Sequence, residues 1–257
     1  MIIDTHAHYD DDKFDEDRDE LIKSLKDGGI DIVVNIGASL DSCKKTIELT
    51  EKYPFIYGGL GIHPSDIGDL NEESFKWLSD ALNRDKIVAV GEIGLDYYWC
   101  DDKAEQKMQR EWFVRQINLA KEKKLPIVVH SREAAKDTLD IIKEEKAEEA
   151  GGIIHCFSYG KEMAREYLDM DFFLGIGGVV TFKNSKKIKE VVEYAPLEKL
   201  VLETDCPYLA PTPFRGKRNS SLYLPYVVKE IADIKKISEQ EVIEITRKNA
   251  LKVYNIS

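Results

Sequence analysis

The stretch Met1-Ile-Ile-Asp-Thr-His6-Ala-His8-Tyr-Asp10 decides how the rest of the chain is interpreted. Ile2 and Ile3 predict a buried strand, and the two histidines follow it one residue apart. Residues i and i+2 of an extended segment point to the same side, so His6 and His8 would address one point. A His-x-His pair alone also fits a solvated turn or a hydrogen-bonded pair, so its meaning depends on which other residues join it.

The composition is that of a globular protein with one large core. The chain has 257 residues, of which 43% are hydrophobic and 33% are charged, and one domain over residues 1–257 is the simplest interpretation. No apolar run approaches the roughly 20 residues of a membrane helix, so we expect no membrane association. Because Met1 leads directly into the first strand without a secretory signal, we expect a cytoplasmic location. The four cysteines have no CxxC spacing, which argues against a zinc knuckle or a dithiol redox site.

The net charge of −11 argues against a surface that grips long duplexes. Two local basic clusters could still meet phosphate groups. The first comprises Lys183, Lys186, Lys187 and Lys189 and is more typical of a solvated helix face, and the second comprises Arg215, Lys217 and Arg218.

Short apolar, β-branched segments alternate with amphipathic segments, which is the pattern of βα units around a parallel sheet. Eight strands are predicted: Met1 to Asp4, Asp31 to Ile36, Phe55 to Leu60, Ile87 to Val90, Ile127 to Val129, Gly152 to Ile154, Phe172 to Ile176, and Leu200 to Leu202. The predicted helices are Arg18 to Gly28, Cys43 to Tyr53, Ser74 to Asn83, Glu105 to Lys124, Ala134 to Glu149, Lys161 to Met170, Ser185 to Tyr194, Leu222 to Lys235, and Glu239 to Leu251.

Eight strands within this length predict an α/β fold of the TIM-type (β/α)8 barrel class. They fit this barrel better than an open doubly wound sheet. Neither GxGxxG after the first strand nor GxxxxGK[ST] occurs, so the usual nucleotide-binding alternatives lack their marker.

Every histidine of the chain falls just after a predicted strand. His63 follows the third strand, and His130 and His155 end the fifth and sixth. Glu92 follows the fourth strand and Asp205 follows the eighth. Because the carboxyl ends of barrel strands meet on one face, where barrel active sites lie, these side chains should converge with the first histidine pair.

Imidazole and carboxylate groups together are good ligands for zinc and similar divalent ions. The set exceeds what one catalytic ion needs, so we expect two ions roughly 3.5–4 Å apart with one carboxylate between them. Glu92 is the natural bridge. Taken singly, His130 or His155 could be a hydrogen-bonded structural residue, Glu92 or Asp205 a helix cap, and His63 a turn residue before Pro64.

Six motifs together resemble the TatD-like metal-dependent deoxyribonucleases, a family of the amidohydrolase superfamily of distorted (β/α)8 barrels. They are Asp4-Thr-His6-Ala-His8, Gly61-Ile-His63-Pro64, Gly91-Glu92-Ile-Gly-Leu-Asp-Tyr97, Leu125-Pro-Ile-Val-Val-His130-Ser-Arg132, His155-Cys-Phe-Ser158 and Leu202-Glu-Thr-Asp205-Cys-Pro-Tyr-Leu209. The resemblance spans nearly the whole chain.

The resemblance implies two divalent ions (Zn, Mn or Mg) and hydrolysis of DNA phosphodiester bonds, commonly as a 3′ to 5′ exonuclease. The first ion would be held by His6, His8, Glu92 and Asp205, and the second by Glu92, His130 and His155. His63 would contact the substrate phosphate, and Glu203 and Arg132 would support the site. No obligate protein partner is indicated.

Two positions depart from the pattern of the family. Many members continue after Arg215-Gly-Lys-Arg-Asn219 with an acidic residue and proline, whereas this chain has Ser220-Ser221. Tyr9 stands where an aliphatic residue is common, and we expect it on the pocket wall. The shape of the loop after Asn219 and the wall beside His8 are therefore the features that the resemblance does not predict.

In the expected reaction, Asp205 accepts the proton of the attacking water, Glu92 bridges the ions, and His63 stabilises the transition state or protonates the leaving oxygen. Arg132, Lys217 and Arg218 would bind a short single-stranded DNA end. Gly175, Gly177 and Gly178 either approach a phosphate or serve only packing and turns. Two rivals remain: a superfamily hydrolase of another ester, amide or phosphoester, and a metal-binding module without catalysis.

Overall fold

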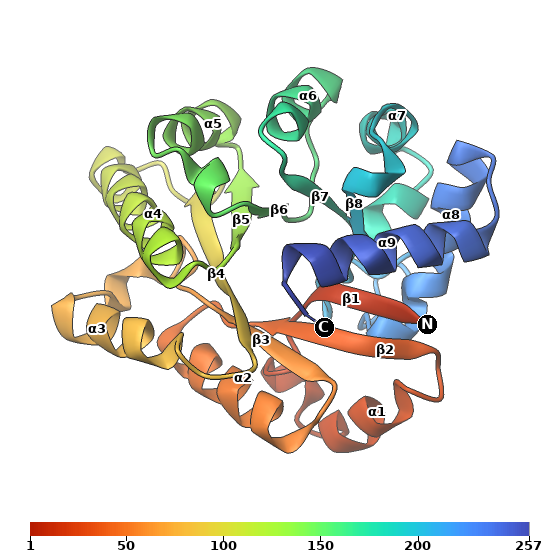
Figure 1. Cartoon of the computed structure of the whole chain (residues 1–257), viewed down its shortest axis with the longest axis horizontal. Helices are drawn as coiled ribbons and strands as arrows, with labels where there is room; N and C mark the ends of the chain where they lie inside the picture. Colours follow the sequence, from red (N-terminus) through yellow and green to blue (C-terminus); the bar gives the residue numbers. More distant parts are fainter. Residues whose placement is uncertain (257) are drawn as a thin grey trace.

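Eight strands pair in chain order into one parallel sheet that curls into a nearly closed barrel (Figure 1). The computed structural model describes residues 1–256. The strands are β1 Ile2–Ala7, β2 Ile30–Ile36, β3 Ile56–Leu60, β4 Ile87–Asp96, β5 Ile127–Arg132, β6 Gly152–Ile154, β7 Phe173–Ile176 and β8 Leu200–Leu202. The predicted (β/α)8 barrel is therefore confirmed, and every predicted strand overlaps an observed one.

The described residues form nine α-helices, which surround the strands (Figure 1). They are α1 Arg18–Ser24, α2 Leu40–Lys52, α3 Glu72–Ala81, α4 Lys103–Lys123, α5 Ala135–Glu144, α6 Lys161–Asp169, α7 Lys186–Tyr194, α8 Leu224–Lys235 and α9 Glu239–Val253. Helix α9 packs against β1 and β8, so the last helix lies beside the first strand.

Helix boundaries differ from the prediction where local capping decides them. Helix α2 begins three residues early because the Ser39 hydroxyl accepts from the Ser42 backbone N–H, 3.2 Å away. The single helix predicted from Ala134 to Glu149 is wrong. Helix α5 ends at Glu144, and Lys146, with φ of 50°, turns the chain into a separate 3-10 turn at Ala147–Glu149.

Three strands run further than predicted, and this places candidate ligand residues inside strands. Strand β1 continues to Ala7, β4 to Asp96 and β5 to Arg132. The polar side chains suggested strand ends, but backbone pairing continues through them, with Gly94 opposite His130 in the β4–β5 ladder. His6, Glu92 and His130 are consequently held by sheet hydrogen bonds.

The seam between β8 and β1 is closed by main-chain hydrogen bonds just beyond the short β8 strand. The Asp205 N–H donates to the His6 carbonyl oxygen at 2.9 Å, and the His8 N–H donates to the Cys206 carbonyl oxygen at 2.8 Å. Closing the barrel in this way sets Asp205 beside the two histidines of β1, although 197 residues separate His8 from Asp205 along the chain.

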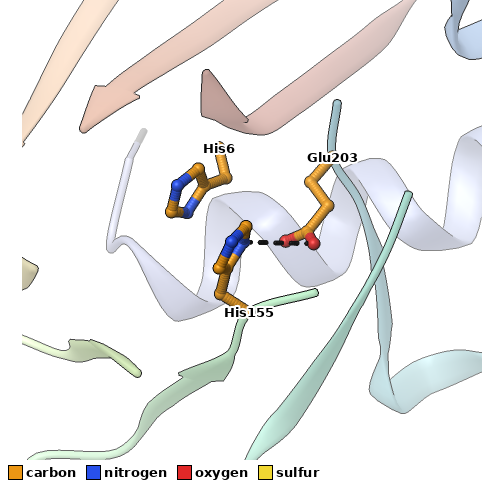
Figure 2. Close-up of side chains that lie close together, drawn as sticks. All are labelled: His6, His155 and Glu203. Carbon is orange, nitrogen blue, oxygen red and sulfur yellow. Dashed lines mark ion pairs between the residues drawn. The ribbon is translucent and has the colours of Figure 1, made fainter. Parts of the chain in front are cut away.

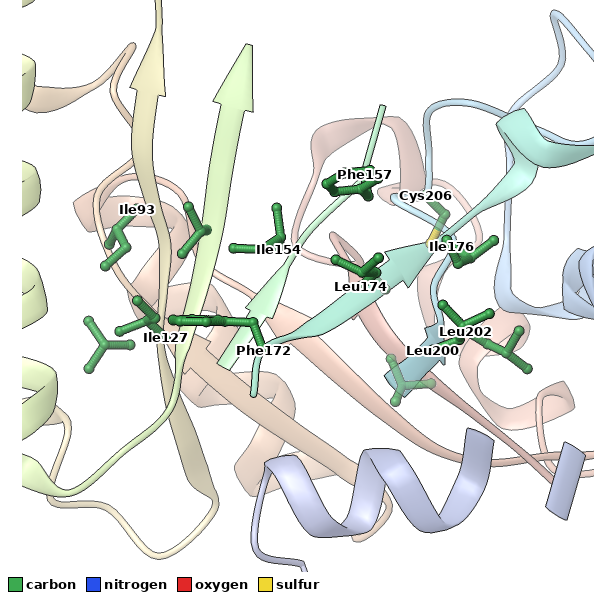
Figure 3. Packing of buried hydrophobic residues seen from close by; sticks show 14 of the residues in the cluster. Ile93, Ile127, Ile154, Phe157, Phe172, Leu174, Ile176, Leu200, Leu202 and Cys206 are labelled. Carbon is green, nitrogen blue, oxygen red and sulfur yellow. The ribbon is translucent and has the colours of Figure 1, made fainter. Parts of the chain in front are cut away.

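Apolar residues form two layers, one inside the barrel and one between the strands and the helices. The inner layer joins residues such as Val34 and Val88 from the strands to Tyr254 and Ile256 at the C-terminal end. The outer layer is shown in Figure 3 and includes Ile93, Ile127, Ile154, Phe157, Phe172, Leu174, Ile176, Leu200, Leu202 and Cys206. Residues two apart in β5, such as Ile127 and Val129, face the outer layer, whereas Val128 between them faces the inner one.

The same alternation aims polar side chains at the carboxyl end of the barrel. Three inner-layer residues are each followed, two positions later, by a polar residue that faces the same way. The pairs are Val128 and His130, Ile153 and His155, and Val201 and Glu203. The barrel interior therefore changes from apolar to ionisable at one level.

The two departures from the family pattern lie against each other. Tyr9 is fully buried under the barrel rim, so the expected position on the pocket wall is wrong. Its hydroxyl lies 2.9 Å from the Ser221 hydroxyl and accepts from the Ser221 N–H at 3.0 Å. Ser221 in turn donates to the Asp4 carboxylate at 2.6 Å. Burial raises the pKa of Asp4 to about 7, although hydrogen bonds from Ser221 and Thr204 oppose this rise. The loop after Asn219 is thus tied to β1.

Tyr9→Phe is expected to lower the free energy of unfolding by about 1–3 kcal/mol, because the buried Ser221 N–H then lacks an acceptor. Urea denaturation of the purified variant measures this. Tyr226→Phe removes a hydroxyl from an exposed ring and serves as the control, with an unchanged midpoint. Equal midpoints for the Tyr9 variant and the wild type would contradict the role given to this hydrogen bond.

Candidate metal centre

Glu92 lies at the centre of the polar cluster and faces two sets of histidines with its two oxygens. Its Oε2 lies 3.4 Å from Nε2 of His6 and 3.7 Å from Nε2 of His8. Its Oε1 lies 2.7 Å from Nδ1 of His130 and 3.7 Å from Nε2 of His155. The residues predicted from four separate strands therefore meet around one carboxylate, which has one oxygen directed to each pair.

Asp205 completes the group at β1. Its Oδ1 lies 3.3 Å from Nε2 of His8 and 3.8 Å from Nε2 of both His6 and His155. The backbone at Asp205 has φ of 55°, a left-handed conformation that Asp tolerates better than most residues. This turn directs the carboxylate back over the barrel mouth.

The donor atoms fit divalent metal ions. His6 Nε2 and His8 Nε2 are 3.0 Å apart, close to the roughly 3.3 Å expected for two imidazole nitrogens bound to one tetrahedral zinc ion. His6, His8 and Asp205 bring three ligand atoms within 4.8 Å of one another, and so do His63, Glu92 and His130. The described residues thus offer these two neighbouring ligand groups of imidazole and carboxylate, and a third, made of His6, His155 and Glu203, overlaps them.

His155 is oriented from behind by Glu203, as Figure 2 shows. The Nδ1 of His155 lies 3.2 Å from Oε1 of Glu203, and the same oxygen accepts from the Cys156 N–H at 2.6 Å. The His6 and His155 rings stack at a centroid distance of 3.5 Å. Glu203 therefore supports the site as predicted, because it leaves Nε2 of His155 turned toward Glu92.

Glu203 also explains a glycine on the neighbouring strand. A Cβ on Gly175 would lie 2.1 Å from Oε2 of Glu203, and one on Gly178 would lie 2.2 Å from the Leu209 carbonyl oxygen. These contacts favour the packing interpretation of the two glycines over phosphate binding.

Asp96 is a supporting residue that the sequence interpretation missed. Its Oδ2 lies 3.1 Å from Nε2 of His130, which leaves Nδ1 of that ring to face Glu92. His8 is held in a similar way, with its Nδ1 2.8 Å from the Ile36 carbonyl oxygen. Asp96 lies in the motif that contains Glu92, four residues further along the chain. If β4 had been predicted to continue past Glu92, the alternation of side chains would have placed Asp96 on the same side as Glu92.

Asp96→Asn is expected to weaken divalent-metal binding at His130 by about 10–100-fold, because an amide cannot hold the His130 Nε2–H as a carboxylate does. The Asn side chain keeps an oxygen that can accept from the Tyr98 N–H, as Asp96 Oδ1 does at 2.9 Å. Metal titration of the variant measures the effect. Asp101→Asn, an exposed change in the same loop, should bind metal normally. Unchanged affinity in the Asp96 variant would refute this positioning role.

Burial and opposite charges set the protonation of the cluster without metal. Burial alone would raise the pKa of Glu92, but the surrounding histidines, led by His155, hold it well below its usual range. Burial alone would lower the pKa of His155 and of His8. Glu203 and Glu92 instead raise the pKa of His155 to about 10, and Asp205 and Glu92 raise that of His8 to about 9. The cluster thus attracts positive charge strongly.

His63 differs from the other histidines of the site. Burial lowers its pKa to about 4, with an opposing contribution from Glu92. The Ser65 N–H donates to Nδ1 of His63 at 3.1 Å, which places the ring proton on Nε2. That nitrogen lies 3.9 Å from Oε1 of Glu92. At neutral pH, His63 therefore presents a neutral Nε2–H to the space beside Glu92.

The cluster forms the floor of a pocket of about 790 Å³ at the carboxyl end of the strands. The lining is strongly acidic. It includes six carboxylates, those of Asp10, Asp11, Asp66, Glu92, Asp96 and Asp205. Arg132 is the one Lys or Arg side chain among the lining residues of the described chain. A phosphodiester would therefore be repelled from this pocket unless bound cations reversed its charge.

The structure separates the three basic residues expected at the substrate. Arg132 lines the pocket, whereas Lys217 and Arg218 are not among its lining residues. Both oxygens of Asp17 accept from the Arg218 guanidinium, at 2.7 and 2.5 Å. Because this pairing uses the fork of Arg218 for structure, the prediction that Arg218 contacts substrate is not supported, and Lys217 has no place at the pocket either.

Comparison with known proteins decides the family. A family model described as "TatD related DNase" matches residues 3–255. The chain belongs to this family. The metal-dependent hydrolase YabD of Bacillus subtilis, described as uncharacterized, is 45% identical over 257 residues, which cover all of both chains. The family, the description of this relative and the ligand groups together show that the chain is a metal-dependent hydrolase, as the sequence predicted.

Solved structures of the TatD family have the same fold. The TatD homologue YjjV of Escherichia coli K12 superimposes with a TM-score of 0.92 at 27% identity, covering 100% of this chain and 98% of that one. An uncharacterized amidohydrolase of Saccharomyces cerevisiae shares the fold at 18% identity, with a TM-score of 0.85 and coverage of 98% and 99%. These likenesses confirm the amidohydrolase-like barrel. Within residues 1–256, no helix has the length and apolar character needed to cross a membrane.

Proposed function

We propose that this protein removes nucleotides from single-stranded 3′ ends of DNA by hydrolysis at a two-ion centre. The observation that carries the proposal is Glu92, whose two oxygens face two separate pairs of imidazoles on the pocket floor. The name of the family supplies the substrate class. A carboxylate placed between two ligand groups is the arrangement of two-metal phosphoesterases.

The ligand groups would divide between the ions around Glu92. His6, His8 and Asp205 would hold the first, and His130 and His155 the second, with Glu92 shared. When bound, two divalent ions lower the pKa of a water molecule and neutralise charge that develops on the phosphoryl oxygens. They also offset the six carboxylates of the pocket, so that an anionic substrate can enter.

Asp205 and His63 would move and hold protons. The Asp205 carboxylate, at the barrel mouth, accepts a proton from the attacking water. Because His63 is neutral and carries its proton on Nε2, it donates a hydrogen bond to a phosphoryl or leaving oxygen. This favours stabilisation of the transition state over protonation of the leaving group.

The charge around the pocket favours a single strand. Asp10, Asp11 and Asp66 line the side of the pocket that follows β1 and β3, whereas Arg132 extends from β5. One strand can place a phosphate at Arg132 and avoid these carboxylates. A duplex would bring a second row of phosphates toward them, which costs electrostatic free energy.

A substrate panel tests the proposal. We expect the purified protein with Mn²⁺ to shorten a 5′-labelled single-stranded oligonucleotide stepwise, to act slowly on a blunt duplex, and to stop when EDTA is added. If no oligonucleotide is shortened while p-nitrophenyl acetate or a phosphotriester is hydrolysed in a chelator-sensitive way, the nuclease proposal is contradicted. That result would favour a hydrolase of another ester. Bound metal without turnover of any compound would favour a binding module. The cytoplasmic location stays a prediction.

A further inference from the structure

Two aromatic side chains shortly after β4 are exposed, and one of them lines the pocket. Trp99 has 73% of its surface exposed and Tyr98 has 53%, although both are large apolar groups. Trp99 is one of the residues that line the pocket, on the same side as Arg132. We propose that Tyr98, Trp99 and Arg132 form a platform on which the base of the terminal nucleotide stacks. This inference rests on the proposed function and assigns its base-binding subsite.

The loop that carries the aromatic rings is fixed to the metal site. The Tyr98 N–H and the Trp99 N–H donate to Oδ1 of Asp96, at 2.9 and 3.4 Å, and the other oxygen of Asp96 holds His130. Further along, the Gln106 side chain donates to the Cys100 carbonyl oxygen at 2.8 Å. An exposed Trp on an anchored loop loses little conformational entropy when a ligand binds.

Arg132 joins the aromatic rings to the phosphate site. Its guanidinium carbon lies 3.9 Å from the centroid of the Tyr98 ring and 5.5 Å from that of the Trp99 ring, a cation–π arrangement. Among residues 1–256 no hydrogen bond or ion pair occupies this guanidinium, unlike that of Arg218, so its N–H groups remain available. Arg132 can therefore donate to a phosphate while the platform receives the adjoining base.

Tyr208 and Leu209, which follow β8, add apolar surface to the same pocket. Tyr208 and Leu209 are 43% and 39% exposed and line the same pocket as Trp99. The Tyr208 hydroxyl donates to Asp11 at 2.7 Å, which holds this ring in place. Stacking on a ring needs no positive charge, so it suits a pocket that has six carboxylates and one arginine. A nucleobase is the flat, uncharged group that accompanies a DNA phosphate.

The test compares wild type with Trp99→Ala on two single-stranded substrates, one intact and one with tetrahydrofuran abasic residues at its 3′ end. On the intact strand, Trp99→Ala should lower kcat/KM roughly 10–100-fold, mainly through KM. Wild type should lose a similar factor on the abasic strand. The two losses should not add, because both remove the same stacking contact. Trp99→Phe should recover most of the activity.

Tyr194→Ala removes an exposed ring at the end of α7 and serves as the control, with kcat/KM unchanged. Equal kcat/KM for Trp99→Ala and wild type on the intact strand would overturn the platform alone. Equal losses by Trp99→Ala on the intact strand and on the abasic strand would also overturn the platform, because the lost contact would then not involve the base. If wild type releases no nucleotide from any oligonucleotide, the proposed function fails, and the platform falls with it.

Discussion

Glu92→Ala is expected to lower kcat/KM on a single-stranded oligonucleotide by at least roughly 10³-fold. The substitution removes both oxygens that face the histidine pairs, Oε2 toward His6 and His8 and Oε1 toward His130 and His155. The two ligand groups would then lose the carboxylate that would join the ions, and catalysis would lose that shared counter-charge. Steady-state kinetics with saturating Mn²⁺ measure the loss.

The fold should survive this substitution, because the apolar layers of the barrel do not include Glu92. Far-UV circular dichroism and an unchanged gel-filtration volume check this. Glu148→Ala, an exposed change between α5 and β6, is the matched control and should keep full activity. Wild-type turnover by Glu92→Ala with metal bound normally would rule out the bridging assignment.

Removing both metal ions should abolish activity and lower the melting temperature by roughly 15–30 °C. Each ion held at about 1,000 times its dissociation constant stabilises the folded state by about 4 kcal/mol. For a chain of this size, 1 kcal/mol corresponds to about 2–4 °C. Differential scanning fluorimetry and nuclease assays before and after EDTA dialysis give both values.

Restoring a divalent ion should restore both the activity and the melting temperature. Addition of Ca²⁺ alone is an informative comparison, because it prefers more oxygen ligands than this imidazole-rich cluster offers. A dialysed protein that contains no metal and keeps its nuclease activity would contradict the metal-dependent account.

The fold and the convergence of the candidate ligands could be predicted because both follow from short-range rules. The eight apolar segments alternate with helices at a spacing that only a closed parallel barrel uses well. Period-two alternation then carries His130 and His155 to the barrel mouth, two residues after Val128 and Ile153. The family model also matches the chain from residue 3 to residue 255, so all six motifs lie within the matched region.

What the sequence did not predict depends on tertiary pairing. Arg218 lies in a basic cluster, and only the folded chain shows that Asp17, 201 residues earlier, binds it. Tyr9 follows a ligand and was expected on the pocket wall, but the turn after β1 directs it inward to Ser221. The exposure of Trp99 likewise depends on the path of the loop that Asp96 anchors.

The number of ions that activity requires tests the central claim most directly. Chelator-treated protein at a concentration well above the dissociation constants would be titrated with Mn²⁺ while its cleavage of a single-stranded oligonucleotide is followed. A centre built around Glu92 predicts little activity at one equivalent and a plateau at two equivalents per chain. A plateau at one equivalent, with no further rise, would contradict the two-ion centre.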